Sequence, residues 1–124
     1  MNMILAIALG GGLGSVTRHY AIGATNGISG DPFPYGTLLV NVLGSFIIGA
    51  LMEAMALKWQ VTLETRAFLV TGFLGGFTTF SSFSWETWKL VEDGRLVMAM
   101  TNILASVVIC LVATFAGAML AKQF

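Results

Sequence analysis

The residues best suited to chemistry lie in the stretch GFLGGFTTFSSFSWE, residues 72–86. Two adjacent glycines, Gly75 and Gly76, are expected to interrupt an otherwise apolar helix, and the backbone carbonyls freed by such an interruption can hold a cation. Five hydroxyl side chains follow within seven positions: Thr78, Thr79, Ser81, Ser82 and Ser84. A single hydroxyl usually bonds back to its own helix. Five so close together predict that several line a wet or ionic surface.

Two phenylalanines, Phe80 and Phe83, alternate with these hydroxyls and lie three residues apart, so they share one helical face. Phe73 and Phe77 extend the same stripe backwards. A stripe of this kind is typical of core packing. Because the edge of an aromatic ring is electropositive, it can also face a small anion without trapping it. Conduction requires sites of that kind, which bind an ion and then release it.

The stretch GTLLVNVLGSFIIG carries one amide, Asn41, next to the centre of a charge-free run at residues 32–52. An asparagine offers two donors and an acceptor. It can join two helices, for an average of ~0.6 kcal/mol in membranes, or it can contact an ion, since intramembrane polar groups mark pathways. The sequence leaves both roles open. Thr37, four residues earlier, lies on the same face.

Composition assigns the chain to the membrane proteins. Of its 124 residues 56% are hydrophobic and 10% are charged, whereas soluble domains carry about 25% charged residues. Four runs contain no Asp, Glu, Lys or Arg: residues 1–17, 32–52, 67–85 and 96–121. A helix of about 20 residues spans a bilayer. A lipid bilayer is therefore the expected surrounding, and no nucleic-acid partner is expected.

The expected fold is an all-α membrane protein with four transmembrane helices in a single domain, residues 1–124. The helices are predicted at residues 4–25, 36–57, 65–91 and 96–121, with the third broken near mid-membrane. The first run lacks the basic start of a signal peptide, so we interpret it as a retained helix. The single cysteine, Cys110, excludes an intrachain disulfide and is expected to be a small apolar residue of the fourth helix.

The number of basic residues on each face of the membrane predicts how the chain is oriented. Four crossings place both termini and the second loop on one face, with the basic residues Lys58, Arg66 and Lys122; the other face carries Arg18, Lys89 and Arg95. An excess of Lys and Arg normally fixes the cytoplasmic side, and here the two faces are equal. We therefore expect the chain to insert both ways up and to form an antiparallel, inverted homodimer, because two-fold dimers are the commonest oligomers.

Several function classes are disfavoured. A proton-coupled exporter of organic cations would need a mid-membrane carboxylate, but Glu53 and Glu86 fall at helix ends. The lone histidine, His19, lies at a predicted membrane interface, and no nucleophile can be paired with a base. The chain is therefore not expected to be an enzyme. Gly10 and Gly14 are interpreted as a helix-packing pair. The same packing role is the alternative for Gly72 and Gly76.

Three stretches resemble the small dual-topology fluoride channels of the Fluc (CrcB-like) family: GGGLGSVTRHY, GTLLVNVLGSFIIG and GFLGGFTTFSSFSWE. The resemblance covers essentially the whole chain. It implies an inverted homodimer with two pores for fluoride, each lined by both subunits. It also implies a multi-pass protein of the bacterial inner (plasma) membrane that exports cytoplasmic fluoride passively, by electrodiffusion.

The resemblance further implies roles for individual residues. Fluoride would be contacted by the ring edges of Phe80 and Phe83 and by Asn41. The remaining pore residues would be Ser81, Thr37 and Glu86, with Glu86 near the aqueous vestibule.

Two further roles come from the same resemblance. The backbone carbonyls of Gly75 and Thr78 would hold a central structural sodium ion, with no organic cofactor. Arg18 would end the first helix as the basic residue of the vestibule. A small dual-topology multidrug or cation exporter is the alternative function, and a non-transporting helical scaffold is a third.

Overall fold

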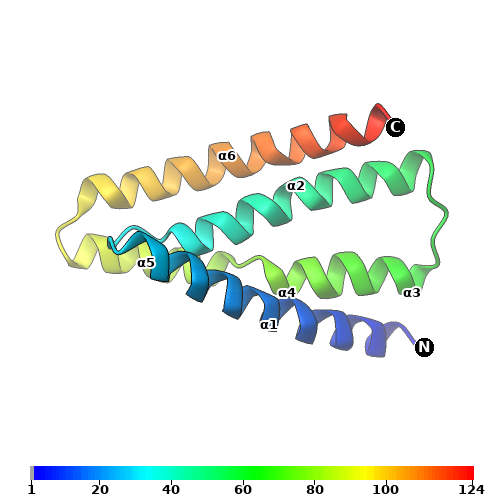
Figure 1. Ribbon diagram of the computed structural model, residues 1–124, viewed down its shortest axis with the longest axis horizontal. Coiled ribbons are helices and arrows are strands. Elements are labelled where there is room, and N and C mark those ends of the chain that lie inside the picture. Colours follow the sequence, from blue (N-terminus) through cyan, green and yellow to red (C-terminus); the bar gives the residue numbers. More distant parts are fainter. Residues whose placement is uncertain (1) are drawn as a thin grey trace.

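The computed structural model describes residues 2–124, which form helices joined by short connections. The third segment is one interrupted rod built from α3, η1, α4 and α5 (Figure 1). The elements in chain order are α1 Met3–Ser29, α2 Tyr35–Leu57, α3 Leu63–Arg66, η1 Ala67–Leu74, α4 Gly75–Phe77, α5 Phe80–Glu92 and α6 Leu96–Lys122. The all-helical fold and the four helical segments are confirmed. Both termini lie at the same end of the molecule (Figure 1).

The first helix is longer than predicted. Asn2 begins it by accepting a hydrogen bond from the amide of Leu5 at 2.8 Å, and Gly30 ends it in the left-handed conformation, with φ of 67°. The family resemblance implied that Arg18 ends this helix, and that implication was wrong, because α1 continues to Ser29. Arg18 lies well inside α1, whose glycines and asparagine near residue 26 are accommodated within the helix.

The third segment is interrupted, but not at the glycine pair where the sequence placed the break. Gly75 is helical, with φ of −62° and ψ of −35°. The residues with extended backbone are Thr78 (φ −90°, ψ 159°) and Thr79 (φ −152°, ψ 122°). Threonine is β-branched and suits extended backbone. The Thr79 hydroxyl then begins α5 by accepting from the amide of Ser82 at 3.2 Å.

The glycines of α1 and η1–α4 instead bring these helices into close contact. A Cβ atom on Gly14 would lie 2.1 Å from the carbonyl oxygen of Phe73, and one on Gly76 would lie 2.5 Å from that of Gly11. Gly10 and Gly72 meet backbone atoms in the same way. The predicted packing role of Gly10 and Gly14 is therefore confirmed. Gly72 and Gly76 have the same role.

This close packing predicts a sharp contrast between two glycines of α1. Gly14→Ala forces backbone atoms apart and should destabilise the folded protein by about 1–3 kcal/mol. Gly12→Ala is the matched control, because a Cβ atom there has no neighbour within 4 Å, and it should be neutral or stabilising through helix propensity. Thermal unfolding in detergent measures both. Equal destabilisation by the two substitutions would show that α1 does not pack as described.

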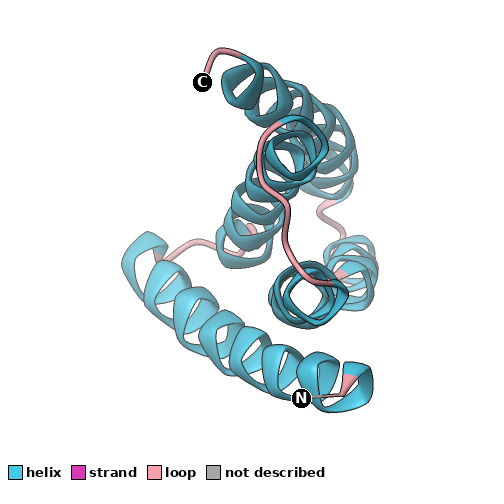
Figure 2. Ribbon diagram, turned by 90° about the vertical axis from the view of Figure 1, so that its right-hand side faces the viewer, coloured by secondary structure: helices cyan, strands magenta, loops and turns pink. Residues whose placement is uncertain are grey.

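The helices associate in two pairs when the molecule is seen end-on (Figure 2). α2 packs along α6, and α1 packs along the third segment. Small residues again allow the first contact, since Cβ atoms on Gly49 or Gly117 would overlap the opposite backbone. The Thr114 hydroxyl reinforces it by donating to the Ser45 carbonyl at 3.1 Å. The outer face of α6 is a continuous apolar surface.

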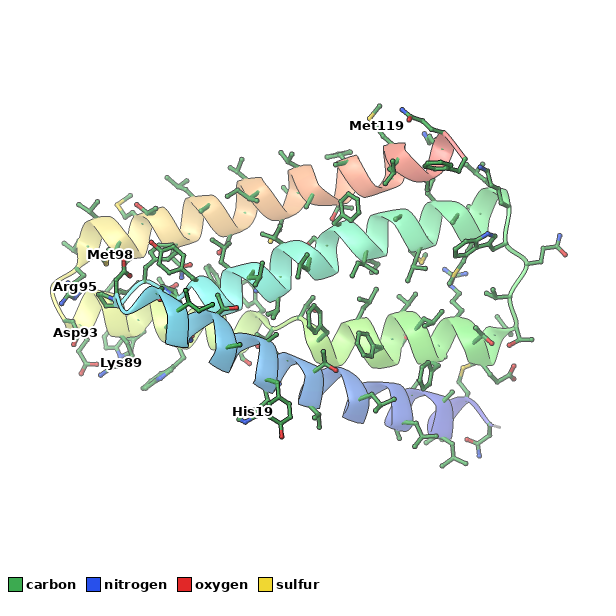
Figure 3. The ribbon with its side chains drawn as sticks, in the orientation of Figure 1. His19, Lys89, Asp93, Arg95, Met98 and Met119 are labelled. Atoms are coloured by element: carbon green, nitrogen blue, oxygen red, sulfur yellow. The ribbon has the colours of Figure 1, made fainter. Side chains whose placement is uncertain are left out.

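Three segments of the described chain have the length and composition to cross a membrane: Tyr35–Leu57, Leu63–Glu92 and Leu96–Lys122. The protein is therefore a multi-pass membrane protein. α1 has 27 residues, enough for a fourth crossing, but its glycines together with Arg18 and His19 make it less apolar. Lys89, Asp93 and Arg95 gather at the end of the molecule that holds the turn between α5 and α6 (Figure 3).

Candidate functional site

The centre of the site is a clamp between Asn41 and Thr79. The side-chain amide nitrogen of Asn41 donates to the carbonyl oxygen of Thr79 at 2.9 Å, and its oxygen accepts from the Thr79 amide at 2.8 Å. Thr79 is only 8% exposed, so its backbone groups need partners. Asn41 provides a partner for both backbone groups of Thr79, which lie in the break and are not paired within the helix. Its second N–H remains available to another group.

The extended backbone at Thr78 and Thr79 releases backbone carbonyls. In a continuous helix the Thr79 amide would donate to the Gly75 carbonyl, but here it donates to Asn41. The Ser82 amide, which would pair with the Thr78 carbonyl, donates to the Thr79 hydroxyl instead. The carbonyls of Gly75 and Thr78 have therefore both lost their helical donors.

Arg18 reaches the same break from α1. Its guanidinium Nη1 donates to the carbonyl oxygen of Thr78 at 3.3 Å. Arg18 is half-buried. The guanidinium therefore faces the interruption itself, whereas the sequence analysis placed it at the end of the first helix.

A groove of about 480 Å³ opens beside the break. It is lined by five residues predicted from the sequence: Asn41, Gly75, Thr78, Phe80 and Phe83. Its opposite wall comes from α6, through residues that include Ser106 and Cys110. The sequence analysis missed this wall, and it took Cys110 for a packing residue, although the four-residue spacing of Ser106, Cys110 and Thr114 on one helical face could have signalled it.

The two phenylalanines of the groove differ in exposure. Phe80 is 77% exposed, whereas Phe83 is 9% exposed. Their ring centroids are 5.2 Å apart with the planes tilted by 54°. Phe73 and Phe77 form a separate stacked pair on the other side of the break. The four phenylalanines are thus two pairs rather than one stripe, and only Phe80 and Phe83 border the groove.

The hydroxyl-rich run divides into several roles. Thr78 and Ser84 donate to carbonyls of their own segment, those of Leu74 and Phe80, at 3.0 and 3.1 Å. Thr79 caps α5. Ser81 is exposed and lies 3.4 Å from the Thr79 hydroxyl. Fewer hydroxyls than expected are therefore free to line a wet surface, and Ser81 is the predicted pore residue among them.

Thr37 and Glu86 form a second polar position away from the groove. The Thr37 hydroxyl faces the Glu86 carboxyl. Within residues 2–124, however, Oγ1 of Thr37 and Oε1 of Glu86 are buried without a well-formed hydrogen bond to any group. Buried polar atoms are nearly always paired. Because the two groups face each other, a hydrogen bond from the Thr37 hydroxyl to the Glu86 carboxyl would satisfy both atoms.

No group of three or more His, Cys, Asp or Glu side chains that could hold a metal ion occurs in the described part of the chain. His19 projects outward from α1, away from the other helices (Figure 3). The polar groups that remain at the site are hydroxyls, amides, freed carbonyls and one guanidinium. Such a set can replace the hydration shell of a small ion.

These features define a class: a small multi-pass helical membrane protein with an interrupted helix, a groove at the interruption and polar groups suited to ions. Residues 5–118 match the family model described as CrcB-like protein, Camphor Resistance (CrcB). That match covers most of the chain, which therefore belongs to the CrcB-like family.

Curated relatives carry a more specific name. The fluoride-specific ion channel FluC of Geobacter sulfurreducens is 52% identical over 123 residues, which are 99% of each chain. The FluC protein of Geobacter metallireducens is 48% identical over the same share of both chains. FluC of Methylococcus capsulatus is 47% identical over 124 residues, and the match covers 54% of that longer protein.

Proposed function

We propose that the protein is a fluoride-selective ion channel that releases cytoplasmic fluoride passively through two pores of an inverted homodimer. The observation that carries the proposal is the groove at the helix break, which brings Asn41, Phe80 and Phe83 together. Near-full-length relatives named as fluoride-specific ion channels support the choice of ion. The protein is a channel and not an enzyme.

The inverted dimer accounts for the open side of the groove. Phe80 is 77% exposed, and a partner copy would cover it. Gly75 is also exposed, which lets two interrupted segments approach each other. The equal basic charge on the two faces favours insertion in both orientations. Each subunit is a single domain, residues 1–124. In this arrangement the interrupted third segments of the two subunits cross at mid-membrane.

Fluoride would be selected by replacing its hydration shell. The free N–H of Asn41 and the Ser81 hydroxyl donate hydrogen bonds, while the ring edges of Phe80 and Phe83 offer weak electropositive contacts. The Thr37 hydroxyl supplies a further hydrogen-bond donor along the path, and the Glu86 carboxyl lies beside it towards the aqueous vestibule. A narrow passage disfavours the larger chloride ion, which also gains less from these donors. Binding of this kind is weak enough for release.

The freed carbonyls suit a structural sodium ion at the centre of the dimer. Carbonyl oxygens of unwound membrane helices coordinate sodium, and Gly75 and Thr78 present two of them from each copy. The Thr78 carbonyl already accepts one hydrogen bond from Arg18, so its second lone pair would face the ion. When bound, sodium would link the two broken segments.

Export needs no coupled energy source. The potential across a bacterial inner membrane is negative inside and drives anions outward with about 2.3 kcal/mol per charge per 100 mV. A multidrug or cation exporter is the alternative function. The described helices carry no carboxylate inside the groove, which disfavours that alternative.

Release from liposomes tests the function. Purified protein should release fluoride from loaded vesicles rapidly, and chloride hardly at all, without a proton gradient. Protein-free vesicles are the control. Release that requires protons together with organic cations would replace the channel by the exporter. No release of any of these ions would favour the helical scaffold.

A further inference from the structure

Asn102 is a buried amide in the second turn of the apolar helix α6. It is 2% exposed, although most of the exposed side chains of α6 around it are apolar. Its side-chain nitrogen donates to the Thr87 hydroxyl of α5 at 2.9 Å, and its oxygen lies 3.5 Å from the Ser106 hydroxyl. Burial of an amide is costly unless it is bonded, so this contact has a structural purpose.

The Thr87 hydroxyl also forms a hydrogen bond to the backbone of α5. It donates its only proton to the carbonyl oxygen of Phe83 at 2.8 Å, so towards Asn102 it acts as an acceptor. The two bonds therefore have compatible directions. Together they form a chain from the α6 amide to the peptide group of Phe83, the buried phenylalanine of the groove.

Little else holds α5 against its neighbours. Of its 13 residues only Phe83 and Leu90 are buried. Within residues 2–124, the bond from Asn102 to Thr87 is the one side-chain hydrogen bond between α5 and α6. The other end of α5 is held by the clamp between Asn41 and Thr79. Besides the short turn that joins α5 to α6, the rotation of α5 about its axis thus depends on one asparagine at the break and another on α6.

We propose that Asn102 is a positioning residue, which acts through Thr87 to set the rotation of α5 and hence the direction of the Phe83 ring. Asn102 does not line the groove, and its amide is already engaged, so it does not act by contacting the ion. This inference rests on the proposed function only for its effect on transport. Its effect on the Phe83 ring is independent of which ion is conducted.

The test compares three substitutions. Thr87→Val keeps the shape of the side chain and removes the hydroxyl, and Thr87→Ser keeps the hydroxyl. Thr101→Val is the matched control, because Thr101 is an exposed neighbour of Asn102 that bonds only to its own helix, at the Val97 carbonyl. A single 4-fluorophenylalanine at position 83 reports the ring environment by fluorine NMR in the detergent-solubilised protein.

We expect Thr87→Val to shift the fluorine resonance at position 83 and to reduce the fluoride-over-chloride preference. We also expect it to slow fluoride release by about tenfold, since displacement of a contacting group by ~1 Å can cost up to ~10²-fold. Thr87→Ser and Thr101→Val should both retain the resonance and the preference. Asn102→Leu should reproduce the Thr87→Val resonance, and the double variant should be no worse than either single one.

An unchanged resonance and ion preference in Thr87→Val and Asn102→Leu would overturn the proposal, even if release slowed. Additive effects in the double variant would do the same. If Thr87→Val fails to fold, Asn102→Leu still decides the matter, because it leaves the Thr87 hydroxyl bonded to the Phe83 carbonyl and removes only the long contact from Ser106. If the wild-type protein released no fluoride, the proposed function would fail, while the resonance would still test the positioning role.

Discussion

Replacement of Asn41 by leucine is expected to abolish fluoride release and to destabilise the protein more than any other single change in the groove. The substitution removes both hydrogen bonds to Thr79, whose backbone amide and carbonyl would remain buried without partners. Each such orphan costs about 1–3 kcal/mol. Loss of these bonds also frees the start of α5, which carries Phe80 and Phe83.

Ser45→Ala is the matched control for this prediction. Ser45 lies one turn beyond Asn41 on α2 and also lines the groove, but it is its carbonyl, not its hydroxyl, that accepts from Thr114. Alanine keeps that carbonyl, so stability and release should stay close to wild type. Thermal unfolding and liposome release measure the two quantities. Wild-type release by Asn41→Leu would show that the clamp has no part in conduction.

Phe80→Ile and Phe83→Ile are each expected to slow fluoride release by about two- to tenfold, the range that corresponds to loss of an aromatic contact worth ~0.5–1.5 kcal/mol. Isoleucine fills part of the space but has no electropositive ring edge. Phe80 is largely exposed in the single chain, so its replacement should leave the folding of the chain nearly unchanged. Phe83 is buried, and its loss should also reduce stability.

Phe77→Ile separates conduction from packing. Phe77 is 6% exposed and stacks on Phe73, outside the groove. Its replacement should lower the unfolding temperature, and release per folded dimer should remain near wild type. Dimer content is checked by size-exclusion chromatography in each case. Undiminished release in both groove variants would remove the role assigned to the ring edges.

The sequence predicted correctly those features that depend only on how deep a residue lies in the bilayer. Gly76 lies at the midpoint of residues 67–85 and Asn41 lies next to the midpoint of residues 32–52, so equal depth in the membrane predicts that they are close. In the structure Asn41 contacts the same segment at Thr79. The four helical segments followed from the same runs. Periodicity and charge are local signals that act over each whole helix, so they were sufficient for these features.

The location of the break depends on contacts that local propensity does not reveal. Glycine is unfavourable in a helix by about 1 kcal/mol, which suggested a break at Gly75 and Gly76. Close packing of Gly76 against Gly11 favours the helix there. The clamp from Asn41 stabilises extended backbone at Thr79 instead. Tertiary contacts therefore overrode propensity.

Arg18 shows the same limitation. The family resemblance implied that Arg18 ends the first helix, where a charge would meet the membrane interface. In the structure a guanidinium inside α1 is stabilised by the carbonyl that the break has freed. The partner is 60 residues away in the chain, and no local pattern signals it. The contribution of Ser106 and Cys110 to the groove depends on long-range packing in the same way.

The central claim is that two inverted copies close their grooves over each other. A density map of the lipid-reconstituted protein with bound halide tests it most directly. We predict antiparallel subunits whose interrupted segments cross halfway through the bilayer, with halide density beside Asn41 and the rings of Phe80 and Phe83. Parallel subunits, or a groove that opens onto lipid, would contradict the account.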